Sequence, residues 1–176
     1  MLTLHTRLEP ADHPLEDIGD EAVLAYDQRE RCRLRIVLES GAVAALFLPR
    51  GSVLRDGDVL TGPEGARVRV RAAREATYRI RAADAHALVR CAFHLGNRHG
   101  QVQIGPDYLR IRADPVLRDM LTGLGATVEE ELAPFHPEPG AYGGGYGHDH
   151  HQDARHLLAP VPLRQKIHRP GDVEHG

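Results

Sequence analysis

The stretch Asp84–His99, DAHALVRCAFHLGNRH, carries the signals for the start, the buried face and the end of one helix. Asp84 is a favourable N-cap, because its carboxylate can accept a hydrogen bond from a backbone N–H of the first turn. Apolar residues then recur at the spacing of one helix face: Leu88, Cys91, Ala92 and Leu95. Gly96 and Asn97 tolerate the left-handed conformation that ends many helices, so the helix is predicted to close there.

Short strands and a second helix are predicted around this first helix. The strands are Thr77–Arg81, Val102–Ile104, Tyr108–Arg112 and Ala126–Leu132. Asp114 followed by Pro115 is an N-cap with proline at the first helical position, which begins the second helix. Its apolar residues are Val116, Leu117, Met120, Leu121 and Leu124. The order βαββαβ indicates a ferredoxin-like arrangement, a two-layer α/β sandwich.

The first part of the chain shows strand patterns only. Arg33–Leu38 and Ala42–Leu48 flank a Ser-Gly turn, as in a hairpin, and Val68–Arg71 alternates strictly between apolar and charged residues. Strands separated by tight turns, without a helical period between them, predict a small antiparallel β domain. The chain as a whole is therefore expected to be an α+β protein.

Three regions are predicted from these patterns and from composition. Residues 1–74 form the N-terminal β domain, residues 75–135 the ferredoxin-like domain, and residues 136–176 a flexible His-rich tail. From Pro134 onward proline, glycine and histidine dominate, and such a segment buries too little apolar surface to offset the entropy of ordering it.

Charge and hydropathy narrow the function classes. The formal charge of −3 gives no reason to expect nucleic acid or a membrane surface as partner. No run of apolar residues approaches the roughly 20 needed to span a bilayer, and the N-terminus lacks a basic start followed by an apolar run, so a cytoplasmic protein is expected. Cys32 and Cys91 lie far apart without CxxC spacing and are expected to be reduced thiols.

His99 is the first candidate metal ligand. It follows the predicted end of the first helix, where a side chain is exposed by default and an imidazole nitrogen can reach an ion. A residue close to a two-fold axis meets its own copy, so a homodimer would supply two His99 ligands. A capping or packing role is the alternative for any lone histidine. His94 lies about 140° around the helix from His99 and is not expected to face the same ion; like His86, it is expected to pack.

Most of the twelve histidines follow residue 135: His136, His148, His150, His151, His156, His168 and His175. Among them His148, His150 and His151 form a short cluster around Asp149. Imidazole clusters of this kind bind nickel, copper and zinc, and an inert tail is the equally weighted alternative.

No catalytic motif is evident. P-loop, Rossmann, HExxH and GxSxG patterns are missing from the sequence, and we expect no enzyme. A zinc hydrolase would need three well-placed protein ligands and an open position, whereas only His99 has a suitable location. Arginines that alternate along Val68–Arg71 are typical of a solvated strand face and do not indicate nucleic-acid binding.

The stretch Phe93–His99, FHLGNRH, resembles the signature of the UreE urease accessory protein family, the nickel metallochaperones of urease maturation. The resemblance extends to LFLPRGSVLRDGDVL (Leu46–Leu60), to PFHPEPGAY (Pro134–Tyr142) and to the His-rich end. It implies an N-terminal β domain that engages peptides or partners and a ferredoxin-like domain that dimerises.

The resemblance also implies the site and the partners. The family's metal-binding histidine falls on His99, two copies of which would bind one Ni²⁺ ion in the homodimer, and its tail histidines match His148, His150 and His151. The partners implied are the urease accessory GTPase and the urease apoprotein complex. Zn²⁺ or Cu²⁺ would compete for the same ligands. The alternative function is a peptide-binding co-chaperone that acts without metal through the N-terminal domain.

Overall fold

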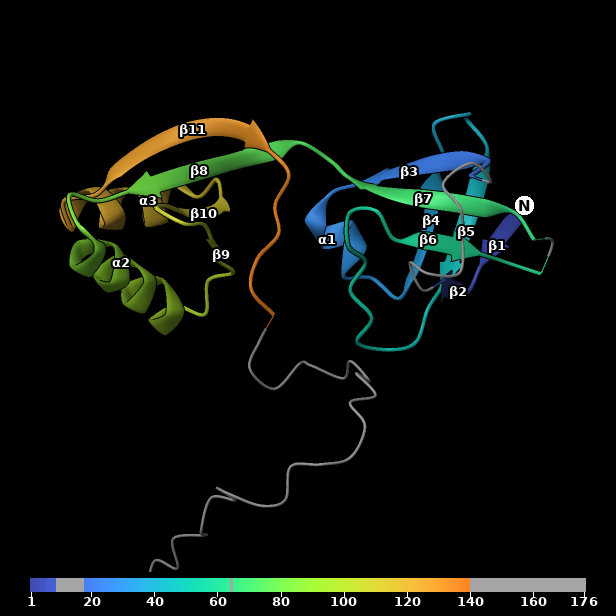
Figure 1. The fold of residues 1–176 in the computed structure, drawn as a ribbon, viewed down its shortest axis with the longest axis horizontal. Helices are drawn as coiled ribbons and strands as arrows, with labels where there is room; N and C mark the ends of the chain where they lie inside the picture. Colours follow the sequence, from blue (N-terminus) through green and yellow to red (C-terminus); the bar gives the residue numbers. More distant parts are fainter. Residues whose placement is uncertain (9–17, 64, 140–176) are drawn as a thin grey trace, which may run out of the picture. The chain divides into compact units, whose positions relative to one another are not determined.

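The computed structural model of the 176-residue chain describes residues 1–8, 18–63 and 65–139. The predicted tail therefore lies outside the described residues from position 140 onward. Figure 1 shows the elements in chain order: β1 (Leu2–Leu4), β2 (Thr6–Leu8), β3 (Asp20–Leu24), α1 (Tyr26–Arg29), β4 (Arg33–Val37), β5 (Val43–Phe47), β6 (Val59–Thr61), β7 (Arg67–Ala72), β8 (Glu75–Arg81), α2 (Ala85–Asn97), β9 (Gln103–Ile104), β10 (Leu109–Arg112), α3 (Pro115–Gly123) and β11 (Thr127–Ala133).

The region before β8 contains two sheets that share one hydrophobic core. Their strand orders are β1-β5-β4 and β2-β6-β7-β3. Apolar and charged residues alternate along β7, and this alternation explains how the strand contributes side chains to the core. Val68 and Val70 are buried, while Arg71 is exposed. The largest fully buried side chains of this core are Leu4, Leu24, Leu46, Leu54 and Leu60.

These sheets are mixed, whereas the sequence predicted antiparallel ones. β1 pairs in parallel with β5, and β3 pairs in parallel with β7. Parallel partners need a long connection between them, and turn residues in the sequence reveal only strands joined by a tight turn. The predicted hairpin of β4 and β5 is local, and it is present and antiparallel.

The region from β8 onward confirms the predicted ferredoxin-like arrangement, and with it the α+β fold class. Its sheet has the order β11-β8-β10-β9, and every neighbouring pair is antiparallel. Helices α2 and α3 pack on one face of this sheet (Figure 1). The core there is formed by buried side chains of sheet and helices: Tyr78, Ile80, Cys91, Leu95, Leu109, Ile111 and Leu121.

Both helices begin as the sequence predicts. The Asp84 side chain accepts a hydrogen bond from the backbone N–H of Ala87 at 2.8 Å, and Asp114 caps α3 ahead of Pro115. The prediction of the apolar face of α3 is wrong for one residue, because Val116 is 66% exposed. The face that packs on the core is centred on Leu117 and Leu121, and Val116 lies beside it in the first turn.

Residues 134–139, here called the strap, are held against the rest of the chain. Phe135 is 0% exposed, and its ring lies edge-on to that of Tyr26 with centroids 5.4 Å apart. The backbone N–H of Glu138 donates to the carbonyl of Val102 at 2.8 Å. The expectation of a mobile segment from Pro134 is therefore wrong for these residues, because a single buried aromatic side chain anchors a segment of otherwise unfavourable composition.

The domain boundary predicted between residues 74 and 75 falls between β7 and β8. The core of the first region and the core of the second have no residue in common. The boundary itself stays a prediction. Among the described residues, no helix has the length and apolar character needed to cross a bilayer.

Candidate metal site

His99 lies exposed on the turn that follows α2, as the sequence predicts. Within the described ranges it is the one residue other than glycine with a positive φ, at 53°. The left-handed position had been expected at Gly96 or Asn97, but both belong to the helix, and Arg98 is its C-cap. The histidine itself therefore occupies the backbone conformation that ends the helix.

Backbone hydrogen bonds fix this turn to the end of α2. The N–H of His99 donates to the carbonyl of Gly96 at 2.9 Å, and the N–H of Gly100 donates to the carbonyl of Leu95 at 3.1 Å. This pair of bonds is the Schellman motif, whose left-handed residue is usually glycine. Because Leu95 is 0% exposed and belongs to the core, the backbone of His99 is anchored while its imidazole faces solvent.

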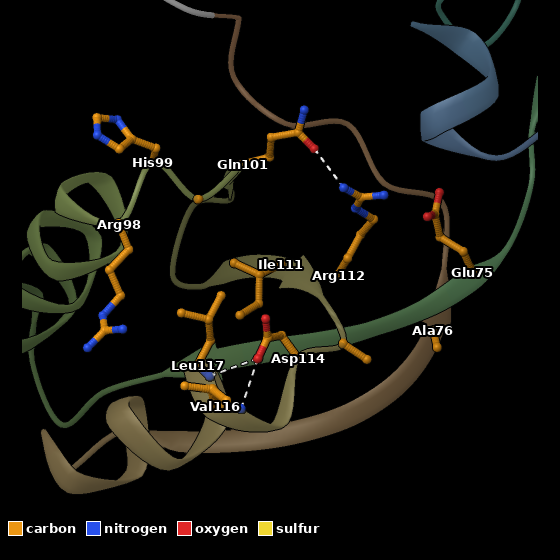
Figure 2. A pocket seen from close by; sticks show the side chains of 12 residues that line it. Glu75, Ala76, Arg98, His99, Gln101, Ile111, Arg112, Asp114, Val116 and Leu117 are labelled. Carbon is orange, nitrogen blue, oxygen red and sulfur yellow. Dashed lines mark hydrogen bonds between the residues drawn. The ribbon is translucent and has the colours of Figure 1, made fainter. Parts of the chain in front are cut away.

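An open depression of about 900 Å³ lies beside His99. Figure 2 shows His99 and Arg98 at one side of it, and Ile111 and Arg112 of β10 and Leu117 of α3 across from them. The ring of His99 points outward from the rim rather than toward Asp114. An ion bound to this imidazole would therefore be accessible from solvent and from a second protein.

The carboxylates of the depression already have partners. Asp114 Oδ1 accepts from the N–H groups of Val116 and Leu117, at 2.8 and 3.1 Å, as the cap of α3. Glu75 Oε1 accepts from the N–H of Tyr26 at 3.0 Å. A carboxylate that caps backbone donors would lose those bonds if it turned to a metal, so neither is a ready ligand.

The segment after His99 is held by side-chain hydrogen bonds. Gln101 Nε2 donates to Glu30 at 2.9 Å, and the guanidinium of Arg112 donates to Gln101 Oε1 at 3.1 Å (Figure 2). Gln101 is thus bonded on both sides of its amide. Together with the helix cap, these bonds hold the chain on both sides of His99, whose side chain is exposed.

Among residues 1–8, 18–63 and 65–139, His99 belongs to no group of three or more His, Cys, Asp or Glu side chains able to hold an ion. The other predicted ligands, His148, His150 and His151, lie outside the described residues. One protomer therefore offers a single imidazole nitrogen here, and a metal would need further ligands from a second copy or from elsewhere in the chain.

The other described histidines have different surroundings. His94 is half-buried on α2, and its ring lies edge-on to that of Phe93, with centroids 5.5 Å apart. His136 belongs to the strap, where partial burial, and after it the positive charge of Arg29, lowers the pKa of its imidazole below the usual 6.5. The neutral form of His136 is therefore favoured in the folded chain.

The strap is the feature that the sequence interpretation missed. Its signal is Phe135, an aromatic residue within a segment rich in proline and histidine, in a chain that has only three phenylalanines. The backbone N–H of His136 donates to Gln103 Oε1 at 3.0 Å, and the Glu138 bond reaches Val102. The strap thus runs beside the segment that follows His99.

Known proteins of one family are similar to this chain along nearly its whole length. The model for the N-terminal domain of the UreE urease accessory protein matches residues 4–73, and the model for its C-terminal domain matches residues 75–159. A urease accessory protein UreE of Janthinobacterium sp. (strain Marseille) is 60% identical over 172 residues, covering 98% of each chain. One of Nitrosospira multiformis is 54% identical over 178 residues, again covering 98% of each.

These matches place the chain among the urease accessory proteins. Within that class it belongs to the UreE family, as the signature around His99 indicated.

Proposed function

We propose that this protein captures Ni²⁺ and delivers it for assembly of the urease active site, without catalysing a reaction itself. The observation that carries the proposal is the position of His99 in a chain of the UreE family, with an exposed imidazole on an anchored turn. Neutral imidazole is a good ligand for nickel, and an accessible site allows the ion to leave by ligand exchange.

A homodimer would supply the second ligand. The outer face of α2, the helix that ends next to His99, carries Val89 and Phe93, which are 67% and 63% exposed. They are four residues apart and so form one apolar patch on the helix. An exposed apolar patch is a common mark of an interface, and a two-fold contact through α2 would relate the two His99 turns by symmetry.

The strap supports a contribution from the tail. Glu138 is bonded to Val102, only three residues after His99 in the chain. His148 follows Pro139 by nine residues, a length that spans at most about 30 Å. Histidines 148, 150 and 151 would therefore be tethered within reach of the candidate site. The tether would raise their effective concentration at the ion, so that they could complete its coordination shell.

The receiving partners in this proposal are the urease accessory GTPase and then the urease apoprotein complex. We place the exchange in the cytoplasm, where the free thiols Cys32 and Cys91 would stay reduced. Copper binds imidazole more strongly than nickel and zinc binds comparably, so Zn²⁺ and Cu²⁺ would occupy the same ligands. Binding would weaken in acid, because a protonated imidazole cannot coordinate a metal ion.

Calorimetric nickel titration with parallel measurement of mass tests the proposal. Three chains are compared: the intact protein, His99→Ala, and a chain that ends at Gly147. We expect about one tight ion per dimer, lost in His99→Ala and weakened by truncation. Unchanged binding by His99→Ala would contradict the assignment of His99.

A second candidate function has one observation in its favour. Val37 and Phe47, on the neighbouring strands β4 and β5, are 65% and 49% exposed in the N-terminal region. β4 ends its sheet among the described strands, and an extended peptide can add to such an edge. Binding of an unfolded peptide that persists in the presence of a chelator would favour this co-chaperone role.

A further inference from the structure

We propose that the C-terminal cap of α2 positions the imidazole of His99, and that the Leu95 carbonyl and Gly100 are its positioning groups. The inference deepens the proposed function and rests on it for the metal-binding part of the test. The backbone part of the test needs no metal.

Histidine is an unusual residue for the backbone conformation at position 99. The left-handed conformation crowds the Cβ of any L-residue other than glycine, and the Schellman motif normally has glycine at this position. A histidine with φ 53° makes the helix end less stable than glycine would. Strained backbone of this kind gathers at functional sites, where the surrounding structure holds it in place.

The cap holds it through two hydrogen bonds and one buried side chain. His99 donates to Gly96 and Gly100 donates to Leu95, whose side chain is fully buried in the core of the second region. A histidine on a freely moving loop would lose backbone freedom when it bound an ion, and that loss would weaken binding. The cap removes this freedom in advance, so the imidazole is presented from a fixed backbone.

Gly100 fits this role for a steric reason. A Cβ at position 100 would lie 3.3 Å from the carbonyl oxygen of Leu95, the atom that accepts the Gly100 N–H. The Cβ of an alanine there would crowd the Leu95 carbonyl oxygen, weaken the cap hydrogen bond and shift the turn that carries His99. Gly96 provides a matched control on the same helix end, because a Cβ at position 96 would meet nothing within 4 Å.

The backbone part of the proposal is tested by urea unfolding of His99→Gly and His99→Ala without metal. Both variants lose the imidazole and differ in backbone preference. In a left-handed position the glycine variant is more stable, by about fivefold or more in the folding equilibrium constant. In any ordinary helical or extended conformation the order reverses, because glycine has more conformational freedom to lose. A glycine variant that is not more stable than the alanine variant overturns the proposal.

The positioning part is tested by nickel titration of Gly100→Ala and Gly96→Ala, each first confirmed as folded by circular dichroism. We expect affinity to fall about tenfold in Gly100→Ala, the scale typical of groups that orient a metal ligand, and to stay unchanged in Gly96→Ala. Wild-type affinity in Gly100→Ala overturns the positioning role and leaves nickel binding through His99 intact. If the intact chain binds no nickel at His99, the proposed function fails, and the positioning role fails with it.

Discussion

The guanidinium of Arg29 donates a hydrogen bond to the carbonyl of Phe135, a residue 106 positions later in the chain. Its other terminal nitrogen donates to the carbonyl of Leu54 at 3.2 Å. Arg29 is almost fully buried, and the same guanidinium lies 5.1 Å from the centroid of the Tyr26 ring. This one side chain therefore ties the strap to α1 and to the segment that follows β5.

Phe135→Ala is expected to destabilise the protein by about 3–5 kcal/mol, because a fully buried phenyl group is replaced by a cavity. The Tyr26 ring would also lose its edge-on partner. Urea unfolding measures the effect. Phe47→Ala is the matched control, since Phe47 is half-exposed on β5 and should cost far less. Equal losses in the two variants would show that the strap is not packed as described.

Arg29→Lys is expected to cost about 1–3 kcal/mol, although the charge is kept. A lysine ammonium lacks the planar fork that lets Arg29 reach the carbonyls of Leu54 and Phe135 together, so one buried carbonyl would lose its donor. Equilibrium unfolding of the two proteins at pH 7 gives the difference. Arg50→Lys, at an exposed turn, is the control and should leave stability unchanged.

Asp114→Ala is expected to destabilise the protein by about 1 kcal/mol, since it removes the cap of α3. The first-turn N–H groups of Val116 and Leu117 would lose their acceptor. Asp119→Ala on the same helix removes an exposed carboxylate and is the matched control. Thermal unfolding of both variants separates the cap from a general effect of charge. A loss confined to Asp119→Ala would refute the assignment.

Phe93→Asp is expected to convert a homodimer to a monomer and to halve the number of His99 imidazoles available to one nickel ion. The charge would have to be buried in the proposed α2 contact without a partner. Light scattering gives the mass, and titration gives the nickel stoichiometry. Val37→Asp places the same charge on an exposed residue of β4 and should leave the dimer intact. A dimer that survives Phe93→Asp would place the contact elsewhere.

The depressed pKa of His136 predicts a loss of stability in acid. In the unfolded chain its imidazole has the ordinary pKa of 6.5. In the folded state partial burial, and after it the charge of Arg29, lowers that pKa. The unfolded chain therefore binds a proton first as the pH falls below 6.5, and stability declines until the folded pKa is passed. Well above 6.5 both states are neutral, and the residue has no effect on the pH dependence of stability.

His136→Gln should therefore flatten the decline in unfolding free energy as the pH falls below 6.5, measured at constant ionic strength. His86→Gln, at an exposed position on α2, provides the comparison. A variant at position 136 with the same slope as the intact protein would show that the folded environment does not lower this pKa.

Local signals in the sequence were enough to predict most of the second region. Asp84, Asp114 and Pro115 act within one helical turn, and the apolar faces of α2 and α3 follow a period that is visible in a few residues. The parallel pairing of β1 with β5 was not predictable in this way, since it depends on residues about forty positions apart. Three-residue strands such as β1 are also too short to show alternation.

The candidate site was predictable in part for similar reasons. The location of His99 after a helix follows from Gly96, Asn97 and the apolar period before them. Its left-handed backbone does not, because composition favours the glycine or asparagine for that role and the hydrogen bonds to Leu95 and Gly96 decide otherwise. The strap was hidden because its stability depends on Tyr26 and Arg29, which lie far away in sequence.

Stability of the helix end and metal binding favour different residues at position 99, in the cap of α2. Glycine is the residue that backbone geometry favours at position 99, and histidine is the residue that can hold an ion. A laboratory selection for heat resistance, run without nickel, should therefore enrich glycine at this position. A selection for heat resistance run with nickel, on cells that depend on urease for nitrogen, should retain histidine.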